Sequence, residues 1–168
     1  MSDLIIRVET VRDYSMIRLV NEAAFGGADE AALVESLRTE RAVLLSVVAE
    51  LDRKIVGHIL FSRISIETPT GVIAAVALAP MAVLPRYQRR GIGGRMIQYG
   101  LDTLRSLGER IVIVVGHPEY YPRFGFSAAQ AGSLESPFPP DTFMTLELSP
   151  GALDRVRGRV RYPHAFGL

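Results

Sequence analysis

The chain has 168 residues, 48% of them hydrophobic, and its 19 basic and 18 acidic side chains give a formal net charge of +1. A chain of this length can bury one substantial core, so we expect a single domain over residues 1–168. The balanced charge argues against a protein that binds nucleic acid or an anionic membrane through bulk charge, and the absence of cysteine excludes disulfides, thiolate metal sites and a cysteine nucleophile.

The chain opens with MSDLIIRVET, which lacks the basic and apolar segments of a secretory signal. No later window holds about 18 uninterrupted apolar residues, the length that a membrane-spanning helix needs. We therefore expect a soluble, cytoplasmic protein with no membrane partner.

The first forty residues predict a strand followed by two helices. LIIRV (4–8) has the composition of a strand, and DEAALVESLRTE (29–40) predicts a short helix capped by Asp29. Between them we expect an amphipathic helix that starts at a Thr10 cap and stops at Gly26-Gly27. Its apolar residues recur at helical spacing: Val11, Met16, Ile17, Val20 and Ala24.

Three long apolar segments then predict strands. LLSVVAEL (44–51) and KIVGHILFSRISIE (54–67) are joined by Asp52-Arg53, which is typical of a tight hairpin. A turn at 69–71 leads into VIAAVALAPMAVLP (72–85), which contains Pro80. Because proline has no N–H for the ladder, we expect this strand to bulge there and to part from one neighbour.

A βαβ unit occupies the centre of the chain. GIGGRMIQYGLDTLRSLG (91–108) has the apolar period of a helix and ends in a glycine stop. IVIVV (111–115) is typical of a strand that is buried on both faces. We expect the strands before and after this helix to be parallel.

The last third of the chain predicts short elements. GHPEYYPRFGF (116–126) is expected to form one or two helical turns around 119–124. Residues 131–141 are expected to form an irregular loop, and MTLELS (144–149) is expected to form a strand. The final strand is expected over GRVRYPHAF (158–166) and the residues just before it. Its arginines are expected on the face opposite Val156 and Val160, namely Arg155, Arg157, Arg159 and Arg161.

The turn PRYQRRGIGGRM (85–96) predicts an anion site. A helix start leaves backbone N–H groups unpaired and carries a partial positive charge. Glycines at 91, 93 and 94 let an anion approach the main chain, and arginines at 86, 89, 90 and 95 add charge. A P-loop is excluded because Gly94-Arg95 stands where that motif needs Lys-Ser/Thr, and the turn lies too late in the chain for a typical dinucleotide fingerprint.

VLPRYQRRGIGG (83–94) is strongly similar to the acetyl-CoA motif of the GNAT N-acetyltransferases, Gln/Arg-x-x-Gly-x-Gly/Ala after a strand that ends in Val-x-Pro. GHPEYYPRFGF and RYPHAF resemble, more narrowly, a YhbS-like subgroup of predicted N-acetyltransferases. The resemblance implies an α/β (α+β) GNAT fold, with a mixed sheet of seven strands flanked by about four helices and a splayed strand pair at the acetyl-CoA site.

Acetyl-CoA is the co-substrate that this resemblance implies. The main chain of Met81, Ala82 and Val83 would pair with the pantetheine arm, and the Val83 N–H would support the oxyanion. The motif residues would hold the pyrophosphate, namely Gln88, Arg89, Arg90, Gly91, Ile92, Gly93 and Gly94.

Tyr121, four residues before Gly125-Phe126, matches the position of the tyrosine that protonates the leaving thiolate in the family, although its neighbour Tyr120 fits nearly as well. The family's strand glutamate has no counterpart here. The remaining candidates for a general base, each more simply a surface group, are Glu22, Glu67, His117, Glu119 and Glu147. The histidines at 58, 117 and 164 lack the spacing of metal ligands, so we expect no metal.

We therefore expect direct transfer of an acetyl group from acetyl-CoA to a primary amine on a small molecule or peptide, without a covalent enzyme intermediate. The acceptor is expected to approach past the first two helices, the Phe138 loop and the C-terminal strands. The alternative is a non-catalytic acyl-CoA binding or sensing domain. No nucleic-acid partner is expected, and the sequence leaves open whether the chain forms a homodimer.

Overall fold

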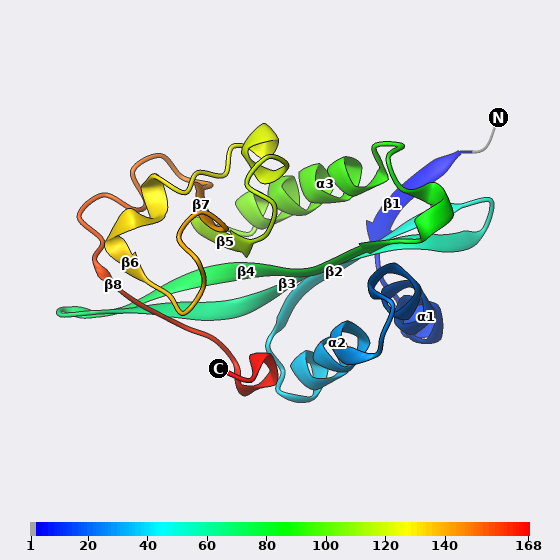
Figure 1. Ribbon diagram of the computed structural model, residues 1–168, viewed down its shortest axis with the longest axis horizontal. Coiled ribbons are helices and arrows are strands. Elements are labelled where there is room, and N and C mark those ends of the chain that lie inside the picture. Colours follow the sequence, from blue (N-terminus) through cyan, green and yellow to red (C-terminus); the bar gives the residue numbers. More distant parts are fainter. Residues whose placement is uncertain (1–2) are drawn as a thin grey trace.

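The computed structural model describes residues 3–168, which form an eight-stranded mixed sheet with helices on both faces (Figure 1). The main strand order is β1-β2-β3-β4-β5-β7, while β8 pairs with both β3 and β6. The strands are β1 (Leu4–Val8), β2 (Val43–Leu51), β3 (Lys54–Thr68), β4 (Gly71–Val83), β5 (Ile111–Val115), β6 (Leu134–Glu135), β7 (Phe143–Glu147) and β8 (Gly158–Arg161).

Three α-helices cover the sheet. Helices α1 (Tyr14–Phe25) and α2 (Asp29–Thr39) lie on one face, and α3 (Ile92–Ser106) lies on the other (Figure 1). Of the described helices, none is long and apolar enough to cross a membrane. The C-terminal 3-10 turn (His164–Phe166) contacts α2, so the end of the chain returns to the α1/α2 face.

The central hairpin and bulge are confirmed. Asp52 and Arg53 have φ of 51° and 63°, as a tight two-residue hairpin between β2 and β3 requires. Opposite Pro80, the pairing of β3 with β4 jumps from Ile59↔Met81 to Phe61↔Leu78, which is the bulge that the proline predicts.

The parallel βαβ unit is also confirmed, and it leaves a gap in the sheet. Strands β4 and β5 pair in parallel only from Val76↔Val112 to Leu78↔Val114. Beyond the bulge, β4 continues to Val83 without a β5 partner. The two strands therefore part on the side where α3 begins.

Three expectations for the elements need correction. The structure has three α-helices because Tyr121–Phe124, which contains Pro122, is a 3-10 turn closed by a left-handed Gly125. The sheet has eight strands because Leu134–Glu135, within the expected loop, pairs with β8. Asp29 is the first residue of α2 and Ala28 its cap.

The expected alternation of the C-terminal arginines is wrong at its start. Strand β8 begins at Gly158, and Arg155 has a left-handed φ of 62° in the preceding turn. Within the strand, Arg159 pairs with Glu135 at 3.1 Å and Arg161 pairs with Glu67 at 3.0 Å. Arg159 and Arg161 therefore each face a carboxylate of the neighbouring strand, on β6 and β3 respectively.

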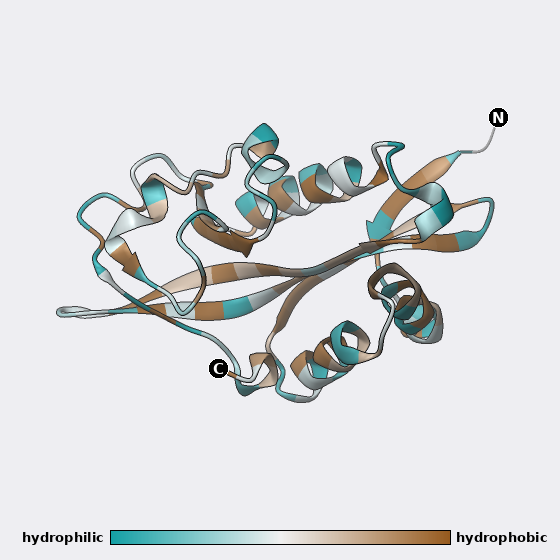
Figure 2. Ribbon diagram, viewed as in Figure 1, coloured by the Kyte–Doolittle hydropathy of each residue, from teal (hydrophilic) through white to brown (hydrophobic). Residues whose placement is uncertain are grey.

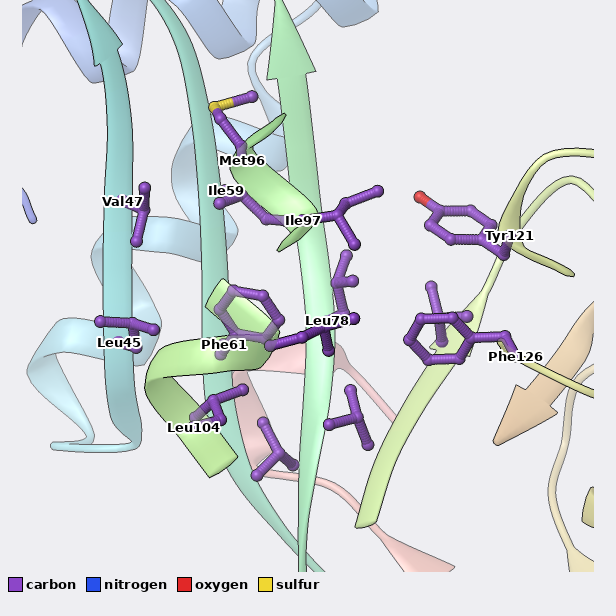
Figure 3. Packing of buried hydrophobic residues seen from close by; sticks show 14 of the residues in the cluster. Leu45, Val47, Ile59, Phe61, Leu78, Met96, Ile97, Leu104, Tyr121 and Phe126 are labelled. Atoms are coloured by element: carbon purple, nitrogen blue, oxygen red, sulfur yellow. The ribbon is translucent and has the colours of Figure 1, made fainter. Parts of the chain in front are cut away.

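The largest core cluster lies between α3 and the sheet. Phe61, Met96, Ile97 and Leu104 are fully buried there, and Tyr121 packs at one side of the same cluster (Figure 3). A second cluster joins α1 and α2 to the opposite face of the sheet. Hydrophobic segments accordingly run along the central strands (Figure 2).

Candidate functional site

A cavity of about 1010 Å³ lies where β4 and β5 part. Its floor is the bulged part of β4, its far wall is the end of β5 with the residues that follow, and its rim is the turn before α3. The fold thus brings the proline bulge, the glycine-rich turn and the tyrosine pair to one place, although they are separated in sequence. The lining residues from these segments include Ala79, Met81, Val83, Arg89, Gly91, Gly93, Gly116, Tyr120 and Tyr121.

The end of β4 presents main-chain groups to the cavity. The N–H of Leu84 donates to the carbonyl of Val56 on β3 at 2.9 Å. Because successive residues of a strand face opposite edges, the main-chain groups of Met81 and Val83 are directed to the other side, where β5 no longer pairs. The carbonyl of Val83 accepts a hydrogen bond from the Gln88 side chain at 2.9 Å, which leaves its N–H for a ligand.

The start of α3 has the form of an anion site. Arg89 and Gly91 both have left-handed φ, 63° and 81°, which curls the main chain into a concave turn. The first helical hydrogen bond runs from the Arg95 N–H to the Gly91 carbonyl, so the N–H groups of residues 92–94 have no acceptor within the helix. The space beside the Gly91 Cα is open for 4 Å.

Gly93 lies close to the first tyrosine of the pair. A Cβ atom at this position would lie 3.0 Å from the Tyr120 hydroxyl and 3.5 Å from the Met81 side chain. The absence of a side chain at Gly93 therefore lets Tyr120 and β4 close around the helix start.

The structure does not place all ten expected cofactor residues on the cavity. Ala82 is only 3% exposed, and its pairing with His58 directs its main chain toward β3. Arg90 lies over the Tyr87 ring, with its guanidinium carbon 5.6 Å from the ring centre. Ala82, Arg90 and Gly94 do not line the cavity. The other seven do: Met81, Val83, Gln88, Arg89, Gly91, Ile92 and Gly93.

The two tyrosines differ in burial. Tyr121 is 8% exposed, and burial raises the pKa of its phenol to about 12. Its ring extends toward β4, with the hydroxyl at the leading end (Figure 3). Burial also raises the Tyr120 pKa, although Arg123 partly offsets this effect. The two rings meet edge to face at 5.1 Å, and neither hydroxyl bonds to another residue in 3–168.

Four of the five base candidates lie away from the cavity. Glu22 pairs with Arg18 at 3.1 Å and Glu67 with Arg161 at 3.0 Å, while the Glu147 carboxylate accepts the Leu153 N–H at 2.7 Å. Glu119 is exposed and is not among the lining residues. Only His117 lines the cavity.

The carboxylate that does line the cavity is one that sequence reasoning missed. Glu30, in the first turn of α2, is partly buried and lies on the wall opposite the glycine turn. This wall also contains Phe25 and Leu33 from α1 and α2, together with three C-terminal rings: Phe138, Tyr162 and Phe166.

His58 is part of a structural network away from the cavity. It is fully buried between Asn21 and Ser46, and burial, reinforced by the charge of Arg38, lowers its pKa to about 3. Within residues 3–168, no three histidine, aspartate or glutamate side chains gather as metal ligands would.

Comparisons with known proteins point to one family. The family model of the acetyltransferase (GNAT) domain matches residues 6–129. The uncharacterized N-acetyltransferase YjhQ of Escherichia coli K12 is 43% identical over 129 residues, which cover 76% of this chain and 71% of YjhQ. The uncharacterized N-acetyltransferase YhbS of the same strain is 31% identical over 166 residues, which cover 97% of this chain and 98% of YhbS.

Two solved structures resemble the whole chain. The crystal structure of E. coli YhbS in complex with CoA has a TM-score of 0.91 at 31% identity, and the match covers 98% of this chain and 92% of that one. A GNAT family acetyltransferase from Brucella melitensis in complex with acetyl-CoA has a TM-score of 0.82 at 37% identity, and the match covers 98% of each chain.

Proposed function

Because this chain belongs to the GNAT acetyltransferase family, we propose that residues 1–168 form one domain that transfers an acetyl group from acetyl-CoA to a primary amine. The observation that carries the proposal is the cavity in which an unpaired strand edge, an open helix start and a buried tyrosine meet. Relatives of the same fold bind CoA and acetyl-CoA, which supports this choice of co-substrate.

Acetyl-CoA spans two parts of this site. Its pantetheine amides bond to the main chain of Met81 and to the second lone pair of the Val83 carbonyl, as an added strand would, and the Val83 N–H is left for the oxyanion. Its pyrophosphate meets the N–H groups of residues 92–94 and the charge of Arg89. The expected roles of Ala82, Arg90 and Gly94 are adjusted accordingly: Gly94 offers its N–H at the helix start, Arg90 packs on Tyr87, and Ala82 belongs to the α1/α2 core cluster.

The reaction needs no covalent enzyme intermediate. The neutral amine attacks the thioester carbon, a C–N bond forms, and the oxyanion accepts the Val83 N–H. The C–S bond then breaks, sulfur leaves with the electron pair, and Tyr121 donates its proton to the thiolate. The new amide nitrogen loses its extra proton to water, and the tyrosine regains one from solvent. The products are the acetylated amine and free CoA.

Tyr121 suits this role by position and protonation. With its pKa raised to about 12, the phenol stays protonated across the physiological range and presents its O–H to a leaving sulfur. The wall of the cavity that contains Tyr121 faces the unpaired end of β4, where the thioester lies in this arrangement.

The test of the site is calorimetric titration of acetyl-CoA into the wild type and into Gly91→Glu. A glutamate here enters open space and sets a negative charge beside the phosphates, so binding is expected to fall below detection. Gly108→Glu is the matched control, because Gly108 also has a left-handed φ, 85°, and open space, but lies beyond the other end of α3.

Equal acetyl-CoA affinity in wild type, Gly91→Glu and Gly108→Glu would remove the assignment of the turn. Saturable binding without turnover of any amine would instead favour a non-catalytic acyl-CoA sensing domain. Selective loss in Gly91→Glu, together with amine-dependent release of CoA by the wild type, is the result we expect.

A further inference from the structure

Five large hydrophobic side chains line the cavity on the side of α1, α2 and the C-terminal turn, and we call them the acceptor chamber: Phe25, Leu33, Phe138, Tyr162 and Phe166, with Glu30 among them. The Phe138 and Tyr162 ring centres are 5.8 Å apart, and those of Tyr162 and Phe166 are 5.1 Å apart. Phe166 packs against the α1/α2 cluster, which Leu33 also contacts, and against a further core cluster that includes Ile64, Ile113 and Val160. The three rings therefore form one fixed unit.

The C-terminal turn that carries Phe166 is anchored to α2. The Ala165 N–H donates to the Glu40 carboxylate at 3.1 Å, just beyond the end of that helix. Phe25 is 45% exposed at the end of α1, although exposing an aromatic ring to water is unfavourable. The chamber thus combines ordered aromatic walls with an apolar ring that is open to a ligand.

Charge is distributed unevenly around the cavity. Glu30 is the only carboxylate among the lining residues, and it makes no hydrogen bond or ion pair with another residue in 3–168. The lining arginines, Arg89 and Arg123, belong to the glycine turn and to the turn that carries Tyr120 and Tyr121. Leu33 follows Glu30 by three residues, so the carboxylate and the apolar wall share one face of α2.

We propose that the acceptor is a primary amine on an apolar, aryl- or alkyl-type body without a carboxylate, bound with its ammonium group against Glu30 and its body in the acceptor chamber. This inference rests on the proposed acetyl transfer and specifies its substrate class. A cationic amine supplies the counter-charge that Glu30 lacks, and an apolar body covers the exposed ring of Phe25.

The same arrangement selects against other amines. The α-carboxylate of an amino acid would enter an apolar wall beside the like charge of Glu30, while the lining arginines, Arg89 and Arg123, belong to the glycine turn and the tyrosine turn. A polyhydroxylated amine would lose several hydrogen bonds to water against this wall, and the Tyr162 hydroxyl, which is buried without a partner in 3–168, could replace few of them. Glu30 acts here as a binding residue. The ammonium proton passes to water before the neutral amine attacks the thioester.

The experiment measures amine binding and acetyl transfer separately. Calorimetry follows 2-phenylethylamine binding to protein saturated with CoA, and a second assay follows CoA release from acetyl-CoA. Phenylalanine adds a carboxylate to the same body, and ethanolamine replaces the ring with a hydroxyl group. Glu30→Gln removes the proposed contact. Asp29→Asn is the matched control, since it removes the same charge from the same turn of α2 at a residue that does not line the cavity.

We expect 2-phenylethylamine to bind at least about tenfold more tightly than either analogue, and Glu30→Gln to weaken its binding by at least about tenfold. Asp29→Asn should leave binding unchanged, and all three proteins should bind acetyl-CoA equally. Equal binding of phenylalanine or ethanolamine, equal losses in both variants, or no amine binding would overturn the substrate class. Glu30-dependent binding without CoA release would overturn acetyl transfer instead, so the two failures are distinguishable.

Discussion

Two adjacent tyrosines lie in the same cavity but contact different parts of it. The Tyr120 hydroxyl is near Gly93 at the start of α3, where the phosphates of acetyl-CoA are proposed to bind. Tyr121 is buried against Phe126, with the ring centres 5.9 Å apart, and extends toward β4. The geometry therefore suggests cofactor binding for Tyr120 and proton donation for Tyr121.

Replacing each tyrosine with phenylalanine separates these roles. Tyr121→Phe keeps the packing but removes the proton donor, so kcat is expected to fall by about 10²-fold with little change in the acetyl-CoA affinity. Tyr120→Phe should chiefly raise the KM for acetyl-CoA. Steady-state kinetics with each variant measures both constants, and the opposite pattern would exchange the two assignments.

The position of Glu30 on the cavity could not be predicted from the sequence. It stands next to Asp29 in the first turn of a helix, where acidic residues are common for reasons of helix stability alone. The two differ by one position, about 100° around the helix, and only the packing of α2 against the rest of the fold decides which faces the cavity. Gly91 and Gly93, in contrast, could be recognised in the sequence itself, because they belong to a glycine-rich turn before a helix.

Among the elements, α3 packs closely against the long strand β3. A Cβ atom at Gly100, in the middle of α3, would overlap the ring of Phe61 on β3. Phe61 is fully buried in the core between α3 and the sheet. The glycine thus sets how closely α3 approaches the sheet, and with it the position of the helix start at the cavity rim.

Gly100→Ala is accordingly expected to destabilise the fold by about 1–3 kcal/mol, because overpacking exceeds the gain of up to about 1 kcal/mol in helix propensity. Urea unfolding measures this difference. Gln98→Ala, at an exposed position of the same helix, should change the stability by less than about 0.5 kcal/mol. A Gly100→Ala protein as stable as the wild type would show that the close contact is not required.

The βαβ unit and the hairpins could be predicted because their apolar periods are long and their breaks are marked by glycine, proline or a two-residue turn. Strand β6 could not, since two residues carry no period and its pairing depends on β8, more than twenty residues later. The proline-containing turn at 121–124 was expected as a helix for a similar reason: only its hydrogen bonds distinguish a 3-10 turn from one turn of α-helix.

At the scale of the whole molecule, one buried polar network links the α1/α2 layer to the sheet. Asn21 of α1 donates to Nδ1 of His58 on β3 at 3.1 Å, and Nε2 of His58 lies 2.8 Å from the Ser46 hydroxyl on β2. Ser46 in turn donates to Glu9, which also accepts from Arg38 of α2 at 2.7 Å. From Asn21 through His58 and Ser46 to Glu9, each bond runs in the same direction when His58 is neutral, with Nδ1 accepting and Nε2 donating.

This network predicts how the stability of the fold depends on pH. The pKa of His58 is about 3 in the folded protein and about 6.5 when the chain is unfolded, so between these two pH values the unfolded state gains the proton and the folded state does not. The free energy of unfolding should therefore fall as the pH falls, by about 2 kcal/mol between pH 7.5 and pH 5 from this residue alone.

Urea unfolding at these two pH values tests the link between the layers. His58→Gln can still accept from Asn21 and donate to Ser46 but does not titrate, so its stability should be about 2 kcal/mol less sensitive to this pH change than that of the wild type. His164→Gln, at an exposed position in the C-terminal turn, should retain the wild-type dependence. If His58→Gln lost as much stability on acidification as the wild type, His58 would have to accept a proton in the folded protein. The assignment of donors and acceptors in the network between α1 and the sheet would then be wrong.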